Sequence, residues 1–397
     1  MPIELRTATE DDLPAMFASD SRAFGFTYEP QDIDDRRSII DLARFQLALD
    51  GGAIVGVAGV YAFEMTLPGG AAVPTGGVTW VHVATTHRRQ GLLTRLMAAV
   101  HDDLRARDEP LAALGASESS IYERFGYGAA TVTRNTRIER HRAEFRADAP
   151  VGGSVRFVTV DEARDVLPKL WDRFRRQRAC EVSLSDGWWD FYAALWRKPD
   201  EGWTTATILV HDDGFLAYRL KEGWDGGFTT TELQVEDSAW CTMEAHATLW
   251  QTVLSTDLVA TVVCGLHALD DPLPMWLKNP RALRSSSLSD GTWVYPLDPR
   301  TVLALRRYDV ADRLVVQVLD GPRLELDASP DGATARPSRR RADLTLTSAA
   351  LGALLMGGVR ATVLGRGRRI DEHTPGSLRR ADRLFDAAPL PFCSTHF

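Results

Sequence analysis

The sequence predicts a mixed α/β (α+β) protein made of three consecutive regions. Segments rich in β-branched and aromatic residues alternate with segments in which apolar residues recur every three or four positions, the pattern of alternating strands and helices. A similar order of segments occurs twice, before and after a Pro/Gly-containing break at residues 148–153. A second break lies near Asp290 and Gly291. We therefore expect region boundaries at 1–148, 149–290 and 291–397.

The first region opens with a strand at residues 3–6. A helix is expected after Thr9, because a threonine hydroxyl followed by carboxylates suits a helix N-terminus, and this helix runs past Phe17. Three strands follow between residues 45 and 83, separated by glycine-containing turns. This order leads into the most informative stretch of the chain.

That stretch consists of a strand, a basic loop and an amphipathic helix between residues 78 and 104. Main-chain N–H groups at a helix start are unpaired and carry the positive end of the helix dipole, so together with Arg88 and Arg89 they suit a pyrophosphate. Gly91 would let such a group approach the backbone closely. The alternative is a solvated basic loop between a core strand and a core helix.

The run Arg88-Arg89-Gln90-Gly91-Leu92-Leu93 resembles the Arg/Gln-x-x-Gly-x-Gly/Ala signature with which GNAT acyltransferases bind the pyrophosphate of acyl coenzyme A. Leu93 departs from that signature, because a small residue is usual there. Downstream, a strand at residues 111–116 precedes a short helix that ends at Gly126. Tyr122 in that helix has the spacing of the GNAT tyrosine that protonates the departing thiolate. A half-buried tyrosine with a satisfied hydroxyl is the alternative.

The second region repeats the order of the first. Its expected strands lie at residues 155–160, 205–210, 215–220, 229–235 and 259–264, and its helices at 166–174, 188–196 and 239–254. At the point that we align with the basic loop, the chain runs Val235-Glu236-Asp237-Ser238. Two carboxylates there would repel a pyrophosphate. We expect a GNAT-like fold without a coenzyme site.

The third region contains strands and helices in a different order. The expected strands lie at residues 314–319, 323–327 and 343–346, and the helices at 348–356 and 377–385. A basic cluster at residues 336–341 is typical of a solvated polar loop, with phosphate binding as the alternative. Phe392, Phe397 and two prolines at the chain end favour docking of the tail over a frayed terminus.

Composition and charge limit the function. The chain has 397 residues, enough for roughly two to three domains. A net charge of −8 argues against a nucleic-acid partner and is compatible with a cationic substrate. No apolar run approaches the roughly twenty residues of a membrane span. We expect reduced thiols, no metal and a cytoplasmic location, because the cysteines lack metal or redox spacing: Cys180, Cys241, Cys264 and Cys393.

From end to end the chain resembles one family, the enhanced intracellular survival (Eis) N-acetyltransferases. The stretch from His87 to Leu93, with Ala116-Ser117-Glu118 and Ile121-Tyr122, carries the resemblance. The resemblance implies a GNAT domain, a GNAT-like domain that lacks the coenzyme loop, and a domain similar to sterol carrier protein 2. It also implies transfer of acetyl groups from acetyl-CoA to amines of aminoglycosides or other polyamine substrates, in a homohexamer.

The same resemblance assigns cofactor-binding residues. Main-chain groups of Val81, His82 and Val83 would hold the pantetheine, and Ser117 with Glu118 would complete the cleft. The residues that would hold the pyrophosphate are Arg88, Arg89, Gln90, Gly91, Leu92, Leu93 and Thr94.

The catalytic pair implied by the resemblance is Tyr122 as the acid and the C-terminal carboxylate, here that of Phe397, as the base. A free α-carboxylate has a pKa near ~3.5 and an amine one near ~10, so direct proton transfer requires that the two values approach each other. Desolvation of the carboxylate and crowding of ammonium groups would both act in that direction. His82 and Glu118 are the rival bases.

The acceptor is expected to meet aromatic side chains. Phe24 and Phe26 lie in a segment that commonly forms a lid over the acceptor, and Trp80 offers a further ring face; all could equally be core. Asp20, Glu118 or the second region would have to supply the acid that binds a polycation. Two other functions stay open, a protein-lysine acetyltransferase and a non-catalytic binding or scaffold protein that uses the sterol-carrier-like region.

Overall fold

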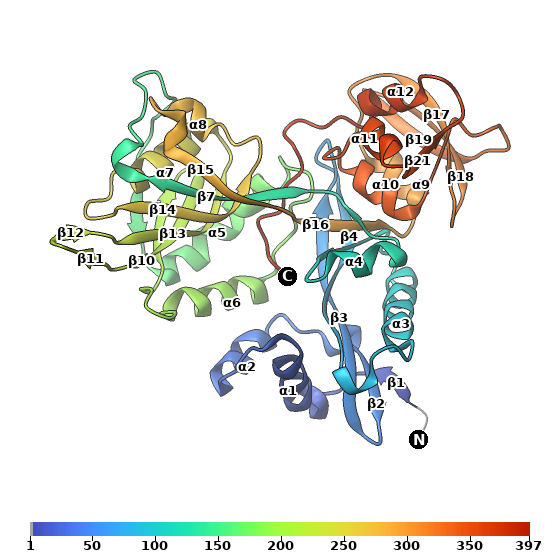
Figure 1. The fold of residues 1–397 in the computed structure, drawn as a ribbon, viewed down its shortest axis with the longest axis horizontal. Coiled ribbons are helices and arrows are strands. Elements are labelled where there is room, and N and C mark those ends of the chain that lie inside the picture. The colour runs from blue at the N-terminus through green and yellow to red at the C-terminus, as the bar shows by residue number, and fades with distance from the viewer. Residues whose placement is uncertain (1–2) are drawn as a thin grey trace.

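The computed structural model describes residues 3–397 and has the mixed α/β architecture that the sequence predicts (Figure 1). Two seven-stranded sheets and one five-stranded sheet each have helices packed against them. Among the described residues, no helix is both long and apolar enough to cross a membrane. The first sheet runs in the order β1 (Glu4–Thr7), β2 (Gln46–Asp50), β3 (Ala53–Thr66), β4 (Ala72–Val83), β5 (Leu111–Gly115), β16 (Thr292–Pro296) and β6 (Gly128–Ala129).

Helices cover both faces of this first sheet. Alternate residues of β3 point to opposite faces: Val57 and Tyr61 pack in one apolar cluster with Phe17, whereas Ala58 and Val60 pack in another beneath the third helix. The helices of this half are α1 (Leu13–Phe24), α2 (Pro30–Arg37), α3 (Leu92–Ala106) and α4 (Ser119–Tyr122).

The second sheet has the same plan. Its order is β8 (Arg156–Val158), β9 (Thr207–His211), β10 (Gly214–Lys221), β13 (Glu232–Trp240), β14 (Thr261–Ala268), β7 (Val132–Glu139) and β15 (Leu283–Asp290). A small hairpin of β11 (Trp224–Asp225) and β12 (Phe228–Thr229) projects from it. The helices of this half are α5 (Val160–Arg175), α6 (Asp186–Arg197), α7 (Met243–Leu254) and α8 (Leu273–Trp276).

The two large sheets exchange one strand each. β7 comes from the expected first region but pairs with β14 and β15 of the second sheet. β16 comes from the expected third region but pairs with β5 and β6 of the first sheet. Both are the sixth strand of the sheet that receives them. The domain boundaries at 148 and 290 therefore stay a prediction. They do not coincide with the limits of the sheets, because each large sheet contains a strand from a neighbouring region.

The third sheet belongs to the C-terminal region. Its order is β19 (Gly332–Pro337), β18 (Arg323–Ser329), β17 (Asp312–Val318), β20 (Leu344–Leu346) and β21 (Ile370–Glu372), and its helices are α9 (Pro299–Leu305), α10 (Ser348–Leu355), α11 (Ala361–Arg366) and α12 (Ser377–Leu384). α10 docks on the first sheet through glycine contacts, since a Cβ at Gly128 or Gly352 would lie 1.8 or 2.0 Å from a carbonyl oxygen of the partner element. The third region is thereby packed directly onto β6 and β16.

Several sequence-based boundaries need correction. β13 continues to Trp240 and α7 begins at Met243, so the helix expected from residue 239 starts later. Glu236 and Asp237 therefore lie inside a strand, at a bulge opposite Ala217 and Tyr218, and not in a loop that corresponds to the basic loop. The basic cluster at 336–341 begins within β19, and β15 and α11 were not predicted.

Candidate active site

The basic loop joins β4 to α3 at residues 84–91. It contains a short 3-10 turn, then Arg89 and Gly91 with φ of +63° and +77°. Among the described residues, no side chain caps the first turn of α3, and no atom lies within 4 Å of the point where a Cβ on Gly91 would stand. Arg88 and Arg89 are exposed beside that turn. The open N–H groups, the dipole and two guanidinium groups fit a diphosphate.

The neighbours of this loop keep it in place without covering it. The ring of His87 meets Asp50, with 3.2 Å between Nε2 and Oδ2. Arg88 lies 4.0 Å from Glu118, and both side chains are 61% exposed. Leu92 is buried and Leu93 packs partly against the cluster beneath α3. The unusual Leu93 therefore turns toward the core, while Gln90 and Thr94 stay exposed.

A bulge interrupts β4 shortly before this loop. Trp80 has a φ of +55°, and the register with β3 shifts there. β4 pairs with β5 through the segment from Thr75 to Gly77, before the bulge. Beyond it, the pairing with β3 resumes at His82 and Val83, and within the described residues β5 does not pair with this part of β4. Its main-chain groups on the side away from β3 are free to bind a ligand such as a pantetheine arm.

Tyr122 lies in the short helix that the sequence predicts; α4 itself ends at Tyr122, and a 3-10 turn at Glu123–Phe125 continues to Gly126. Its side chain is buried in the cluster beneath α3, with its ring centroid 6.2 Å from that of Tyr127. Burial raises the pKa of Tyr122, which the neighbouring Ser117 hydroxyl partly opposes. The phenol thus keeps its proton at neutral pH and can donate it.

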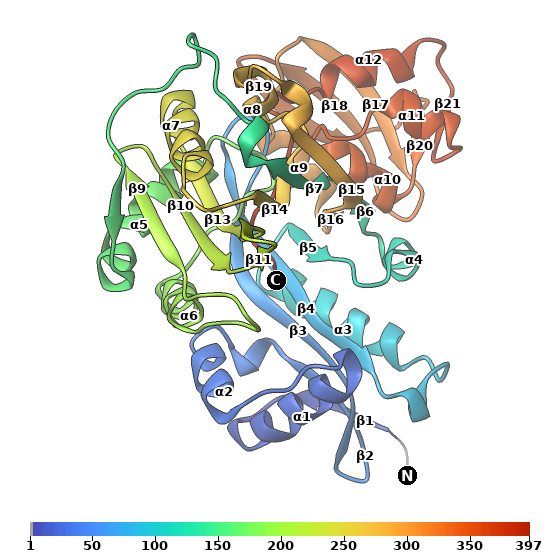
Figure 2. The same ribbon diagram turned by 60° about the vertical axis from the view of Figure 1, so that its left-hand side comes forward.

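The chain end reaches the first sheet at the place where β4 and β5 separate. The ring of Phe397 lies 5.0 Å from that of Phe63, centroid to centroid. A Cβ on Gly115 would lie 3.8 Å from a main-chain oxygen of Phe397, and one on Gly77 would lie 3.1 Å from its ring. Figures 1 and 2 both show the C-terminus between the two large sheets.

The aromatic residues expected at the acceptor side divide into two groups. Trp80 is partly buried: its ring contacts those of Phe17 and Phe45, and its Nε1 donates to Tyr61 at 3.1 Å. Phe24 and Phe26 stack at 6.1 Å and are 39% and 57% exposed. Trp80 is thus anchored in the core, whereas the two phenylalanines are accessible.

His82 lies between the ring of Phe24 and α1. Its Nε2 lies 2.9 Å from the Ser19 hydroxyl and its Nδ1 3.9 Å from Asp20. Burial lowers the pKa of His82 to about 4, so the ring is a poor base at neutral pH. Burial also raises the pKa of Asp20, against the hydrogen bond that Tyr28 donates at 2.6 Å.

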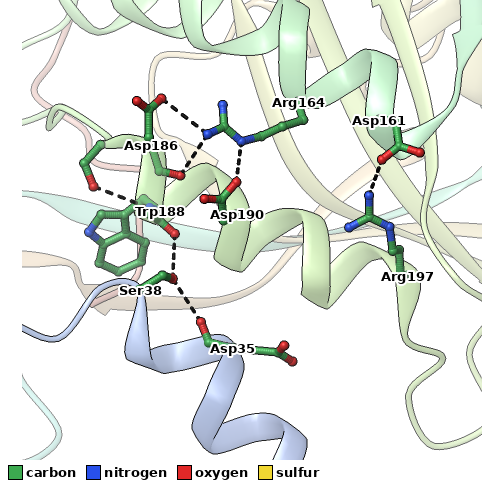
Figure 3. A network of polar contacts seen from close by, with 10 residues as sticks. Asp35, Ser38, Asp161, Arg164, Asp186, Trp188, Asp190 and Arg197 are labelled. Carbon is green, nitrogen blue, oxygen red and sulfur yellow. Dashed lines mark hydrogen bonds and ion pairs between the residues drawn. The ribbon is translucent and has the colours of Figure 1, made fainter.

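The second half contacts α2, the helix that follows the segment with Phe24 and Phe26. Figure 3 shows Ser38 just after α2, donating to the carbonyl of Gly187 in α6 at 3.0 Å, while Arg164 ties α5 to Asp186 and Asp190. Lys198, which follows α6, donates to Asp32 of α2 at 3.0 Å. These residues were not predicted, because single charged residues give no sequence signal of their partner.

The junction at the corresponding place in the second half is built differently. Only Cys241 and Thr242 separate β13 from α7. The hydroxyl of Thr242 accepts from the N–H of Ala245 at 3.2 Å and so caps the helix. The second half offers no arginine pair and no open helix start at this junction.

Family models match the chain in three places. Residues 4–130 and 181–295 each match an acetyltransferase (GNAT) domain, and residues 301–394 match a sterol carrier protein domain. These are the three kinds of domain that the sequence resemblance implied.

Individual relatives cover almost the whole chain. The N-acetyltransferase Eis of Mycobacterium tuberculosis (strain ATCC 25177 / H37Ra) is 32% identical over 403 residues, which is 98% of either chain. An uncharacterized N-acetyltransferase of Streptomyces avermitilis is 33% identical over 94% of either chain. The structure of Eis1 from Mycobacterium abscessus has a TM-score of 0.88 at 29% identity and covers 99% of this chain and 100% of its own. A GCN5-related N-acetyltransferase from Anabaena variabilis shares the fold, with a TM-score of 0.86 at 16% identity over 100% of both chains. The chain therefore belongs to the Eis family of N-acetyltransferases, whose GNAT domains use acetyl-CoA.

Proposed function

We propose that this enzyme moves the acetyl group of acetyl-CoA to a primary amine of an aminoglycoside-like or other polyamine acceptor, by direct attack in a ternary complex. The observation that carries the proposal is the open start of α3 with its two arginines. This helix follows β4, and the chain end reaches the place where β4 separates from β5. Acetyl-CoA supplies an activated thioester, and the net charge of −8 suits a polycationic acceptor.

Two sets of residues would hold the coenzyme. Arg88, Arg89 and the main-chain N–H groups of the first turn of α3 would bind the pyrophosphate. The free main-chain edge of β4 beyond the bulge would bind the pantetheine, with Ser117 and Glu118 at the other wall. Phe24, Phe26 and Trp80 would contact the acceptor.

Proton transfer needs one acid and one base. Tyr122 is the acid, since its buried phenol is neutral and can protonate the thiolate that leaves. The α-carboxylate of Phe397 is the base that takes a proton from the attacking amine. It is favoured over His82, whose pKa of about 4 makes it weak, and over Glu118, whose side chain is largely exposed.

The chain end provides the test. Adding several residues after Phe397 moves the charge away, whereas Phe397→Leu keeps the carboxylate and changes only the side chain. We expect the extension to lower kcat by at least tenfold, since a misplacement of about 1 Å can cost on the order of 10²-fold, and Phe397→Leu to cost far less. The readout is coenzyme A release with a panel of amine acceptors. Full activity in the extended protein would reject the carboxylate as base.

Two further features rest on the family resemblance and are proposed with it, a homohexameric assembly and a cytoplasmic location. The mass of the purified protein in solution tests the first. The same measurement on the extended and substituted chains shows whether a change in turnover reflects chemistry or assembly.

A further inference from the structure

The last residues of the chain cross the junction of the two large sheets through a series of specific contacts. The N–H of Leu390 donates to Asp270 at 2.8 Å, and Asp270 also forms an ion pair with Arg178. The N–H of Phe392 donates to the carbonyl of Ala179 at 2.9 Å. The tail is therefore attached to the segment at residues 178–181 before it reaches the first sheet.

The last of these contacts involves a buried acid. Glu181 is fully buried, and Ser394 donates to its Oε1 with both its N–H at 3.1 Å and its hydroxyl at 3.0 Å. Burial raises the pKa of Glu181 to about 8, against the opposing effect of these hydrogen bonds. A neutral carboxyl keeps both contacts, because its carbonyl oxygen has two lone pairs and can accept from the N–H and from the hydroxyl.

The segment that contains Glu181 is tied to the first sheet. The N–H of Thr66 at the end of β3 donates to the carbonyl of Glu181 at 2.9 Å, and the N–H of Ser183 donates to that of Glu64 at 2.8 Å. Phe63, on the same strand, contacts the ring of Phe397. One strand thus holds both the partner of Ser394 and the ring of the terminal residue.

We propose that Glu181 is a positioning residue, which sets the place of the Phe397 carboxylate by holding Ser394. Ser394 is three residues before the chain end, so the carboxylate can move by at most about 10 Å from this anchor. Glu181 does not act on the substrate itself, because its side chain is buried in the protein. The effect on turnover rests on the proposed role of the chain end; the docking of the tail does not.

Three substitutions test whether the contact between Glu181 and Ser394 holds the tail. Glu181→Gln keeps a carbonyl oxygen and adds an amide N–H₂ group; the carbonyl oxygen can accept from both the N–H and the hydroxyl of Ser394, so this variant should retain docking. Glu181→Ala removes both contacts. Ser394→Pro removes both donors of the tail without leaving a hole in the core, and serves as the second variant if Glu181→Ala fails to fold.

Docking is measured by release of Phe397 with a carboxypeptidase, followed by mass spectrometry of the assembled enzyme. We expect release to be about tenfold or more faster in Glu181→Ala and Ser394→Pro than in the wild type, and unchanged in Glu181→Gln. In parallel, kcat for one amine acceptor should fall about tenfold or more in the first two variants while KM for acetyl-CoA stays within about twofold. Glu181→Gln should restore both readouts.

The outcomes distinguish this inference from the proposed function. Wild-type protection of Phe397 in both Glu181→Ala and Ser394→Pro would overturn the role of Glu181, whatever the activity. Faster release with unchanged kcat would overturn its link to turnover. If the extended chain keeps full activity while Glu181→Ala still releases Phe397, the base has been misassigned and the docking role of Glu181 stands.

Discussion

The two halves of the enzyme share a sheet order but differ at the junction between the central strand and the following helix. In the first half, residues 84–91 leave the start of α3 open between two arginines. In the second half the chain turns within Cys241 and Thr242, and Thr242 caps α7 with its own hydroxyl. Both strands before the junction carry a bulge. The proposed diphosphate site therefore depends on the junction and not on the fold.

A second difference concerns the short helix that follows the next strand. In the first half this helix ends at Tyr122, and in the second half α8 ends at Trp276. A phenol can give up a proton, whereas an indole N–H serves only as a hydrogen-bond donor. The second half also places two histidines around one buried carboxylate, since His246 and His267 lie 3.0 and 3.1 Å from Asp271.

The largest effect is expected from reversing the charges of the open junction. Arg88→Glu with Arg89→Glu should weaken acetyl-CoA binding by roughly 100-fold or more, because two charge-assisted contacts are lost and repulsion is added. Calorimetry of the wild type should give one site per chain. Arg339→Glu with Arg341→Glu makes the same change in charge on an exposed loop and should leave binding intact. A stoichiometry of two would refute the contrast between the halves.

The next effect concerns proton donation. Tyr122→Phe should keep acetyl-CoA binding but lower kcat by roughly 10², the usual size for loss of a general acid. Trp276→Phe, at the end of the corresponding helix, removes no acid and should leave kcat nearly unchanged. Steady-state rates with one acceptor check both. A Tyr122→Phe rate within about twofold of the wild type would mean that the thiolate leaves unaided.

Two buried histidines, one in each half, should also respond to pH in opposite directions. Burial lowers the pKa of His101 in α3 to about 4, so the stability that its neutral form contributes is lost as pH falls from about 6.5 toward 4. For His267, burial acts the same way but Asp271 outweighs it and the pKa rises to about 9. That contribution is present below about 6.5 and is lost as pH rises through 9.

Thermal unfolding of paired variants tests this contrast. The difference in Tm between wild type and His267→Gln should be several degrees at pH 6 and shrink by pH 10. The difference for His101→Gln should be largest above pH 7 and shrink toward pH 4. If the Tm differences of both variants changed with pH in the same direction, the opposite pKa shifts of the two histidines would be contradicted.

The smallest effect is expected at the two helix starts. Thr242→Ala should destabilise the enzyme by about 1 kcal/mol, the usual cost of a lost cap, without changing acetyl-CoA binding. Gly91→Ala meets no steric clash but strains a positive φ, at a similar cost of about 1 kcal/mol, and should also weaken binding. Denaturant unfolding and calorimetry of the two variants measure both quantities. Weaker acetyl-CoA binding in Thr242→Ala would contradict the expectation that the start of α7 affects stability alone.

Local patterns in the sequence were sufficient for most elements and for the open junction. Arg88, Gly91 and Tyr122 lie on the loop and helix expected for them. The position of Glu236 and Asp237 was predicted wrongly, because a bulge interrupts the apolar alternation of β13 and makes the middle of a strand resemble its end. Nothing local marks Glu181, since a buried acid and its partner Ser394 are far apart in the chain.

The same limitation applies to the exchanged strands. Neither β7 (Val132–Glu139) nor β16 (Thr292–Pro296) was predicted from the sequence. Which sheet receives a strand depends on contacts between distant segments, which no local pattern contains.

The exchange of β7 and β16 has a consequence for how the chain folds during synthesis. β5 ends at Gly115, but the strand that pairs beside it, β16, begins at Thr292 and leaves the ribosome much later. At roughly 5–20 residues per second, the edges of β5 and β6 stay unpaired for many seconds. The first half cannot complete its sheet before the second is made, so the two halves should unfold as one cooperative unit, and neither should be stable as an isolated fragment.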